Sequence, residues 1–221
     1  NKSLLDFRHI SIEARKSAWD LQFYYLNRKF LPFIEDPNDR KLVEYFFLQT
    51  KEFAEPHFEN LRKGMIQGDA NEWNVLANDG KVSGIIDFGD LFYSPLITEL
   101  AIAIAYATLY VENPIDDILP LLKGYNEILQ LTEKEIEFLY YLIPLRLCIS
   151  VCHSANARRE MPENEYALVS EKGAWRILRE WVRLNPVLVE DKFRKACGFD
   201  SKIVDSNKKD FKIRQKHTSN V

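Results

Sequence analysis

The scarcity of glycine is the feature of this sequence that most limits its fold. Only 8 of the 221 residues are glycine, about half of the ~7% in average proteins. Chains with many tight turns between strands and helices need more glycine than this. Apolar residues instead recur at helical spacing over most of the chain, as in Ile102, Ala105, Tyr106 and Leu109. We therefore expect a mainly α protein.

The same periodicity predicts where the helices lie. We expect helices near 11–28, 39–62, 96–111, 115–130, 133–158, 166–183 and 187–196. Thr132 and Glu135 have the spacing of a capping box ahead of the fifth of these. Strand character is confined to 65–66, 74–77 and 82–88, and Asp79-Gly80 between the last two runs predicts a β-hairpin. The sequence thus predicts a helical domain with one small β hairpin or sheet.

Composition and charge exclude several classes of protein. The chain is 46% hydrophobic and 29% charged, as expected for a globular protein with a sizeable core. Its 30 Lys and Arg residues against 33 Asp and Glu residues give a net charge of -3. Because a nucleic-acid binder must neutralise many phosphates, this balance argues against nucleic acid as the main partner.

The sequence also argues against a membrane or secreted protein. The apolar stretches 96–111 and 138–152 are interrupted by Glu99 and by Pro144 with Arg146, and both are shorter than the ~20 residues of a span. Three cysteines do not suggest a disulfide framework. We expect no membrane partner and a cytoplasmic location.

Two acidic residues and an asparagine in the β region form a pattern typical of phosphoryl transfer. Asp69 and Asn74 lie five positions apart on a predicted loop, and Asp87 follows at the end of a strand, within Asp87-Phe88-Gly89. Transfer from a nucleoside triphosphate needs a carboxylate near the acceptor hydroxyl and oxygen ligands for Mg²⁺. We assign Asp69 as the catalytic carboxylate near the acceptor hydroxyl. Asn74 and Asp87 are assigned as the ligands of Mg²⁺ and, through it, of the nucleotide cofactor. The alternatives are an ordinary turn residue for Asp69, an Asx turn for Asn74 and a turn cap for Asp87.

The residues around this pattern resemble the aminoglycoside phosphotransferase and choline kinase family, which shares the protein-kinase fold. The family's run His-Gly-Asp-x-x-x-x-Asn followed by Ile-Asp-Phe-Gly stands here as 67–74 and 86–89. The stretches 69–74 and 83–90 are most similar to the hydroxylysine kinase-like branch. The resemblance implies a kinase that uses Mg²⁺ and ATP or GTP. Gln67 replaces the usual His, and its amide can still donate and accept hydrogen bonds.

One part of the kinase fold has no counterpart in this sequence. Kinases of this fold cover the phosphates with a glycine-rich hairpin and a following Lys, both upstream of the catalytic loop. Before Asp69 the chain has only Gly64 and Gly68. We therefore expect residues 1–199 to be a kinase-like C-terminal lobe without its N-lobe, inactive alone, with the N-lobe supplied by a longer parent chain.

Residues 200–221 carry six basic side chains and few apolar ones. We expect a basic linker or tail, with a weak nucleic-acid or lipid contact as the alternative. The resemblance and the run 213–217 suggest an aminotransferase fused downstream. The alternative function is accordingly a non-catalytic pseudokinase or scaffold module in such a multidomain protein.

Asp90, directly after Gly89, is a candidate for binding the acceptor. A carboxylate there would bind an ammonium group, and Trp73 or Tyr93 would add a cation–π contact. We expect an amino alcohol or hydroxylated amino acid as acceptor, with a solvated loop charge as the alternative for Asp90.

Three further side chains have structural explanations. Glu99 and Arg146 are expected to form a buried ion pair. His153 is expected to be a helix histidine with its hydrogen bonds satisfied and without a metal, because no second His or Cys cluster has ligand spacing.

Overall fold

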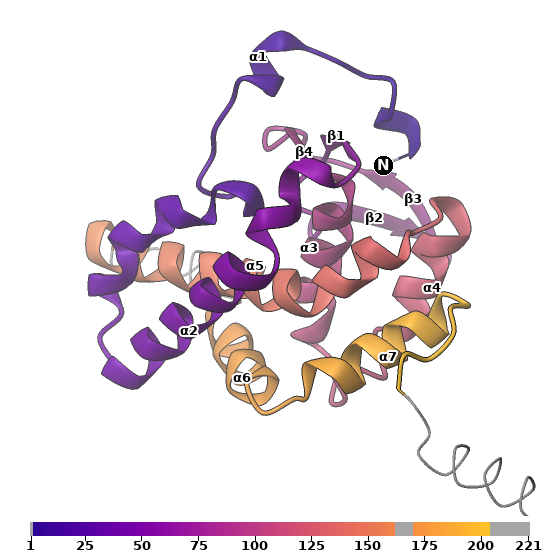
Figure 1. The fold of residues 1–221 in the computed structure, drawn as a ribbon. Helices are drawn as coiled ribbons and strands as arrows, with labels where there is room; N and C mark the ends of the chain where they lie inside the picture. The colour runs from indigo at the N-terminus through magenta and orange to yellow at the C-terminus, as the bar shows by residue number, and fades with distance from the viewer. Residues whose placement is uncertain (1, 162–169, 204–221) are drawn as a thin grey trace, which may run out of the picture.

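The computed structural model describes residues 2–161 and 170–203, and its fold is mainly α, as predicted (Figure 1). The α-helices are α1 (Ile10–Glu13), α2 (Pro37–Phe53), α3 (Leu96–Thr108), α4 (Leu119–Ile128), α5 (Glu133–Glu160), α6 (Glu171–Trp181) and α7 (Pro186–Ala196). Three 3₁₀ segments are η1 (Lys2–Leu4), η2 (Leu21–Phe33) and η3 (Glu55–Asn60). The strands are β1 (Lys63–Ile66), β2 (Val75–Asn78), β3 (Lys81–Ile85) and β4 (Phe92–Pro95).

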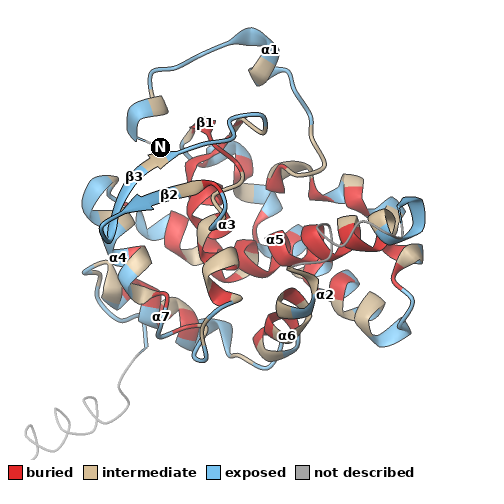
Figure 2. Cartoon of the chain, turned by 180° about the vertical axis from the view of Figure 1, so that it is seen from behind, coloured by how far each residue is buried: buried red, intermediate tan, exposed pale blue. Residues whose placement is uncertain are grey.

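Helix α5 is the centre of the domain. The predicted capping box is present, since Thr132 Oγ1 accepts from the Glu135 N–H and the Glu135 side chain accepts from the Thr132 N–H. The helix packs against η2, α2, α3, α6 and α7. Among the described helices it is long and apolar enough to cross a membrane by composition, but 83% of its most apolar window is buried inside the protein. Burial in the core therefore accounts for its apolar character (Figure 2).

The four strands form two separate antiparallel pairs, which lie on the opposite side of α5 from α6 and α7 in both ribbon views. Strands β2 and β3 form the predicted hairpin. Asp79 and Gly80 have φ angles of 49° and 71° at its turn, a left-handed pair that suits Asp-Gly. Most residues of this hairpin are exposed, as their colour in Figure 2 shows.

Strand β4 is a feature that the sequence analysis did not predict. It pairs with β1, with Met65 opposite Tyr93 and Ile66 opposite Phe92. The pairing brings the start of the loop that carries Asp69 beside the residues that follow Gly89. It therefore positions the two halves of the predicted motif against each other.

The predicted helix at 11–28 is wrong. The chain forms only α1, then an irregular segment, and then η2, which begins after Asp20. The Asp20 side chain is 1% exposed, and it accepts hydrogen bonds from Gln22 and from the Ser94 hydroxyl of β4. A helix through this position would remove the Asp20 cap, so the tertiary contact overrides the local periodicity.

The predicted helix at 39–62 is also too long. Helix α2 ends at Phe53, and Pro56 lies at the start of η3, where a continuing helix would lose a backbone hydrogen bond.

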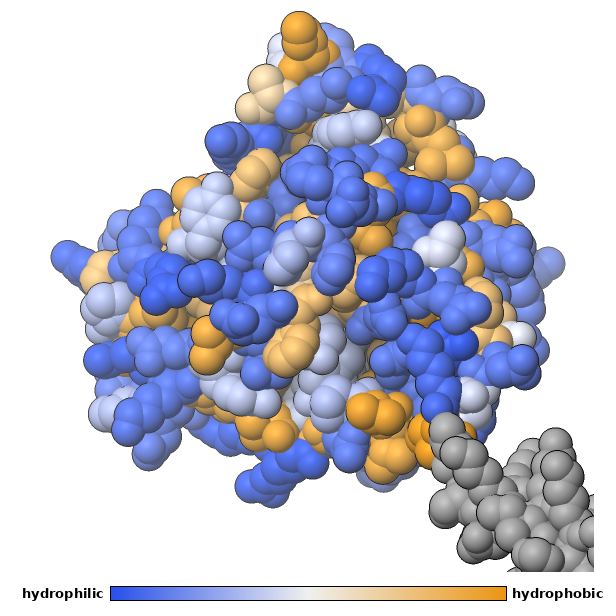
Figure 3. Space-filling view, viewed as in Figure 1, coloured by the Kyte–Doolittle hydropathy of each residue, from blue (hydrophilic) through white to orange (hydrophobic). Residues whose placement is uncertain are grey.

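Residues 166–169 of a third predicted helix and 204–221 of the predicted tail lie outside the described residues. Hydrophilic side chains cover most of the face in Figure 3, with apolar ones scattered among them.

Candidate active site

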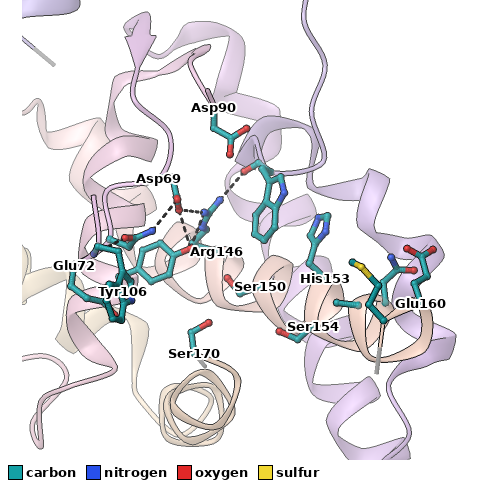
Figure 4. A pocket seen from close by; sticks show the side chains of 16 residues that line it. Asp69, Glu72, Asp90, Tyr106, Arg146, Ser150, His153, Ser154, Glu160 and Ser170 are labelled. Atoms are coloured by element: carbon teal, nitrogen blue, oxygen red, sulfur yellow. Dashed lines mark hydrogen bonds and ion pairs between the residues drawn. The ribbon is translucent and has the colours of Figure 1, made fainter. Parts of the chain in front are cut away.

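Asp69, labelled in Figure 4, lies on the loop between β1 and β2, and its carboxylate accepts four side-chain hydrogen bonds. Oδ1 accepts from Arg146 Nη2 at 2.8 Å and from the Tyr106 hydroxyl at 3.1 Å. Oδ2 accepts from Asn71 Nδ2 and Asn74 Nδ2, both at 2.9 Å. The side chain is still 23% exposed. The carboxylate is therefore fixed on both oxygens while one side of it faces solvent.

Gln67 connects this loop to the strand end that carries Asp87. Its Nε2 donates to the carbonyl oxygens of Ile86 at 3.2 Å and Asp87 at 2.7 Å, and its Oε1 accepts from the Asp69 N–H at 2.8 Å. Gln67 is 3% exposed. An amide at this position thus supports both loops, which needs a donor and an acceptor on one side chain.

Glu99 of α3 holds the backbone of the same loop. Its carboxylate accepts from the N–H groups of Gln67 at 3.2 Å and Gly68 at 2.9 Å. Burial raises the pKa of Glu99, and the Gly68 N–H opposes this shift. The expected Glu99–Arg146 ion pair is not formed, because Arg146 binds Asp69 and Glu99 binds backbone.

Asn74 and Asp87 lie on neighbouring chain segments at the base of the hairpin. The Ile86 N–H donates to the Asn74 carbonyl oxygen at 2.9 Å. Asp87 has a left-handed φ of 57° and is exposed, while Asn74 is 6% exposed and donates to Asp69. No group of three His, Cys, Asp or Glu side chains among the described residues could hold a metal alone. An amide and a carboxylate oxygen suit Mg²⁺, which takes its remaining ligands from phosphate and water.

A cavity of about 400 Å³ opens beside Asp69, and one face of α5 forms its floor (Figure 4). Arg146, Ser150, His153 and Ala157 follow helical spacing along this face. The other lining residues are Trp19, Asn71, Glu72, Trp73, Asp90, Tyr106, Ser154, Asn156, Glu160, Met161 and Ser170. The cavity thus brings together Asp69, Trp73 and Asp90, whereas Asn74 and Asp87 are not in its lining.

His153 contributes a neutral polar group to this cavity. Its Nε2 is buried and has no hydrogen-bond partner among the described residues, so the expectation of a histidine with satisfied hydrogen bonds is wrong. Its ring stacks on Trp19 with the centroids 3.9 Å apart. Burial, together with the nearby charges of Arg146 and Lys29, lowers the pKa of His153 to about 4. The imidazole is therefore uncharged near neutral pH.

Asp90 borders the cavity and already has a partner. Arg15 donates to Asp90 Oδ1 at 3.3 Å and to the Gly89 carbonyl oxygen at 2.7 Å. Trp73 is 63% exposed. Tyr93 is not in the lining, and its ring lies 4.4 Å below the Arg8 guanidinium, which argues against its expected contact with the acceptor.

Sequence reasoning missed the roles of Tyr106 and Arg15, and it gave Arg146 the wrong partner. The signal for Arg146 was present as a charge inside the apolar stretch 138–152. Tyr106 lies 37 residues after Asp69, and Arg15 lies 75 residues before Asp90. No local sequence pattern therefore connects either residue to the site.

Comparison with known proteins assigns the family. Residues 4–134 match the model of the phosphotransferase enzyme family, and the chain belongs to that family, as the motif predicted. It is also similar to the hydroxylysine kinases of Mus musculus and Bos taurus, with 29% and 28% identity over 217 residues, which cover 92% of this chain and 58% of each relative. The hydroxylysine kinase of Xenopus laevis is 29% identical over 178 residues, 76% of this chain and 48% of that protein. The chain spans about half the length of these curated relatives.

Proposed function

We propose that this chain is the C-terminal lobe of a kinase that transfers the γ-phosphoryl group of ATP or GTP to a hydroxyl group of an amino alcohol or hydroxylated amino acid. The observation that carries the proposal is the position of Asp69. Its carboxylate borders a cavity of about 400 Å³ and is fixed by four donors. The hydroxylysine kinases to which the chain is similar support the proposed acceptor class.

In this mechanism Asp69 accepts a hydrogen bond from the acceptor hydroxyl and takes its proton as the oxygen attacks the γ-phosphorus, whose bond to the β–γ bridging oxygen breaks so that the nucleoside diphosphate leaves. Asn74 and Asp87 would hold Mg²⁺, which neutralises the charge of the phosphates when it is bound. Gln67 keeps the two loops in register through its bonds to Asp69 and Asp87. Phosphoryl transfer depends mainly on such positioning and charge neutralisation.

The charges around the cavity favour a cationic acceptor. Four carboxylates line the cavity, and the one Lys or Arg among the described lining residues is Arg146, which is already paired with Asp69. Of the other three carboxylates, those of Glu72 and Glu160 have no cation within the described lining, and that of Asp90 is paired with Arg15, which lies outside it. An ammonium group would be attracted to them, and the exposed Trp73 ring could add a cation–π contact of ~0.5–2 kcal/mol.

The nucleotide half of the site needs a further part of the parent protein. Five apolar side chains of the hairpin and of the segment after it are between 44% and 69% exposed, namely Leu76, Val82, Ile85, Ile86 and Phe88. An exposed apolar group of this kind is typical of a surface that another domain covers. We propose that the N-lobe packs there, and that the chain alone does not turn over.

A fused aminotransferase beyond residues 200–221 remains a sequence-based prediction. We also propose a reducing, cytoplasmic compartment, since Cys148, Cys152 and Cys197 are free thiols.

The test is a phosphoryl-transfer assay on the full-length parent protein with hydroxylated amines, hydroxylated amino acids and neutral sugars. Asp69→Asn should reduce kcat far more than it changes the acceptor KM. Asp87→Asn should weaken Mg²⁺ dependence and nucleotide use together. A preference for neutral sugars, or wild-type rates for both variants, would contradict the proposal and favour the scaffold alternative.

Asp90 provides the test of the acceptor class. Asp90→Ala should raise the acceptor KM by roughly one to two orders of magnitude and leave the nucleotide KM unchanged, because a charge-assisted hydrogen bond contributes ~1.5–3 kcal/mol. Asp116→Ala is the matched control, since Asp116 is also a surface carboxylate paired with a cation, Lys192. Equal kinetics for the two variants would show that Asp90 is only a solvated charge.

A further inference from the structure

Arg146 is an unusual residue for its position. It is 2% exposed and lies within α5, the most apolar of the long described helices. Burying a guanidinium costs free energy, and a well-packed apolar side chain at such a site is often as stable or more stable than the ion pair. Stability alone is therefore a poor explanation for an arginine here.

The contacts of Arg146 converge on one oxygen of Asp69. Its Nη2 donates to Asp69 Oδ1 at 2.8 Å and to the Tyr106 hydroxyl at 2.9 Å, and Tyr106 in turn donates to the same Oδ1 at 3.1 Å. Its Nη1 donates to the Trp19 carbonyl oxygen at 3.2 Å, and the guanidinium lies 4.7 Å from the Trp19 ring centroid. Backbone and ring contacts thus hold the guanidinium in place independently of Asp69 (Figure 4).

Tyr106 can serve as a donor because it stays protonated. Burial raises its pKa, although the charge of Arg146 opposes the shift. Since the Tyr106 oxygen accepts from Arg146, its hydroxyl hydrogen is left for Asp69. The Asp69 carboxylate can only accept, so Tyr106 donates to Asp69 while its own oxygen accepts from Arg146, and the three side chains form one connected set of hydrogen bonds.

We propose that Arg146, acting with Tyr106, is the positioning residue of the reaction: it fixes the carboxylate of Asp69 as an oriented anion at the edge of the cavity. This inference rests on the proposed function. Arg146 acts from the buried side, whereas Asn71 and Asn74 hold the other oxygen from the loop. Without Arg146 the carboxylate loses its fixed direction, and a displacement of about 1 Å at a reacting group can cost roughly 100-fold in rate.

The experiment compares Arg146→Met, Arg146→Lys and Tyr106→Phe in the full-length protein, each alone and combined with Asp69→Asn. Arg146→Met should lower kcat by roughly 100-fold with less than about threefold change in either KM. Arg146→Lys should recover part of the loss, because it restores the charge but not the two-point contact. In the Asp69→Asn background, Arg146→Met should cause no further loss of kcat.

Arg194→Met is the matched control. Arg194 is also a buried arginine, 4% exposed, and it donates to a carboxylate, Glu133, and to a backbone carbonyl oxygen, that of Asp200. It is not in the lining of the cavity. Its replacement should lower the melting temperature and leave kcat unchanged. If the role of Arg146 were purely structural, Arg146→Met would give this same pattern.

Three results would overturn the proposal: a wild-type kcat for Arg146→Met, an acceptor KM change as its main effect, or additive losses with Asp69→Asn. If Arg146→Met does not fold, Tyr106→Phe and Arg146→Lys carry the same test. A wild-type protein that phosphorylates no acceptor contradicts the proposed function instead. In that case the NMR signals of the Asn71 and Asn74 side-chain amides decide: they should shift in Arg146→Lys and not in Arg194→Met, and unchanged signals would refute the positioning role.

Discussion

Replacing Asp69 with asparagine should destabilise the protein, although removal of an active-site residue often has the opposite effect. The two carboxylate oxygens accept from four donors, belonging to Arg146, Tyr106, Asn71 and Asn74. An asparagine amide offers one oxygen and one NH₂ group. In either orientation its NH₂ group faces two donors, so two of the four hydrogen bonds are lost, and the buried guanidinium loses its counter-charge.

The magnitude follows from these contacts. Two hydrogen bonds contribute about 1 kcal/mol each, and the unpaired guanidinium adds a penalty that the 23% exposure of residue 69 reduces. The sum is about 2–4 kcal/mol, which lowers Tm by roughly 5–15 °C in a domain of this size. Calorimetry of the wild-type and Asp69→Asn chains measures it. Asp90→Asn is the control, since its exposed pair with Arg15 at 3.3 Å contributes ~1 kcal/mol or less. An Asp69→Asn variant that melts at or above the wild-type temperature would refute the reasoning.

Three further predictions concern stability. Because the pKa of His153 is lowered to about 4 in the folded state, protonation of His153 favours the unfolded chain. The free energy of unfolding should therefore fall by roughly 1–3 kcal/mol between pH 6.5 and pH 4. Urea unfolding at several pH values measures this dependence, and His153→Gln should lack it. Gly68→Ala should lower stability by more than about 2 kcal/mol in thermal melts, because Gly68 has a φ of 84° and a Cβ there would lie 2.5 Å from the Asp90 carbonyl oxygen. Gly124→Ala in α4 is the control. With nothing within 4 Å of its Cβ, it should be neutral or stabilising in the same melts. Glu99→Ala leaves two buried N–H groups without their acceptor and should cost about 2–4 kcal/mol by chemical denaturation.

The parts of the fold that depend on residues close together in the sequence could be predicted. The Thr132 capping box gave the start of α5, and Asp79-Gly80 gave the hairpin. Strand β4 was missed because it is four residues long, ends in proline and pairs with β1, about thirty residues away. The helix predicted at 11–28 failed for a related reason, since the Asp20 cap is fixed by Ser94 of the same strand.

The candidate site divides in the same way. Asp69 and Asn74 were predicted from one loop, and the structure joins them by a hydrogen bond. Their assigned roles in catalysis and metal binding remain predictions. The partners that fix Asp69 from the buried side, Tyr106 and Arg146, come from α3 and α5. Only packing of these helices brings them to the loop, so spacing along the chain could not predict them.

The two halves of the site differ in how they are supported, which leads to a last prediction. The proposed acceptor half is built on α5, which is packed on several sides by other helices, and its cavity is formed by described residues of this chain. The proposed nucleotide half depends on Asp87, an exposed residue next to an exposed hairpin. We therefore expect the 221-residue chain alone to bind the acceptor amine, to bind Mg²⁺ with ATP weakly, and to show no measurable turnover.

Calorimetric titration of the isolated chain with each ligand measures the difference between the two halves. Asp90→Ala should weaken binding of the amine by roughly 10-fold or more, while Asp116→Ala should leave it unchanged. Binding of Mg²⁺ and ATP should be weak in the isolated chain and become tight only when the N-lobe is present, because the apolar side chains around Phe88 are uncovered without it. Robust phosphorylation by the isolated chain would show that the exposed hairpin needs no covering lobe, and the division of the site between two lobes would then be wrong.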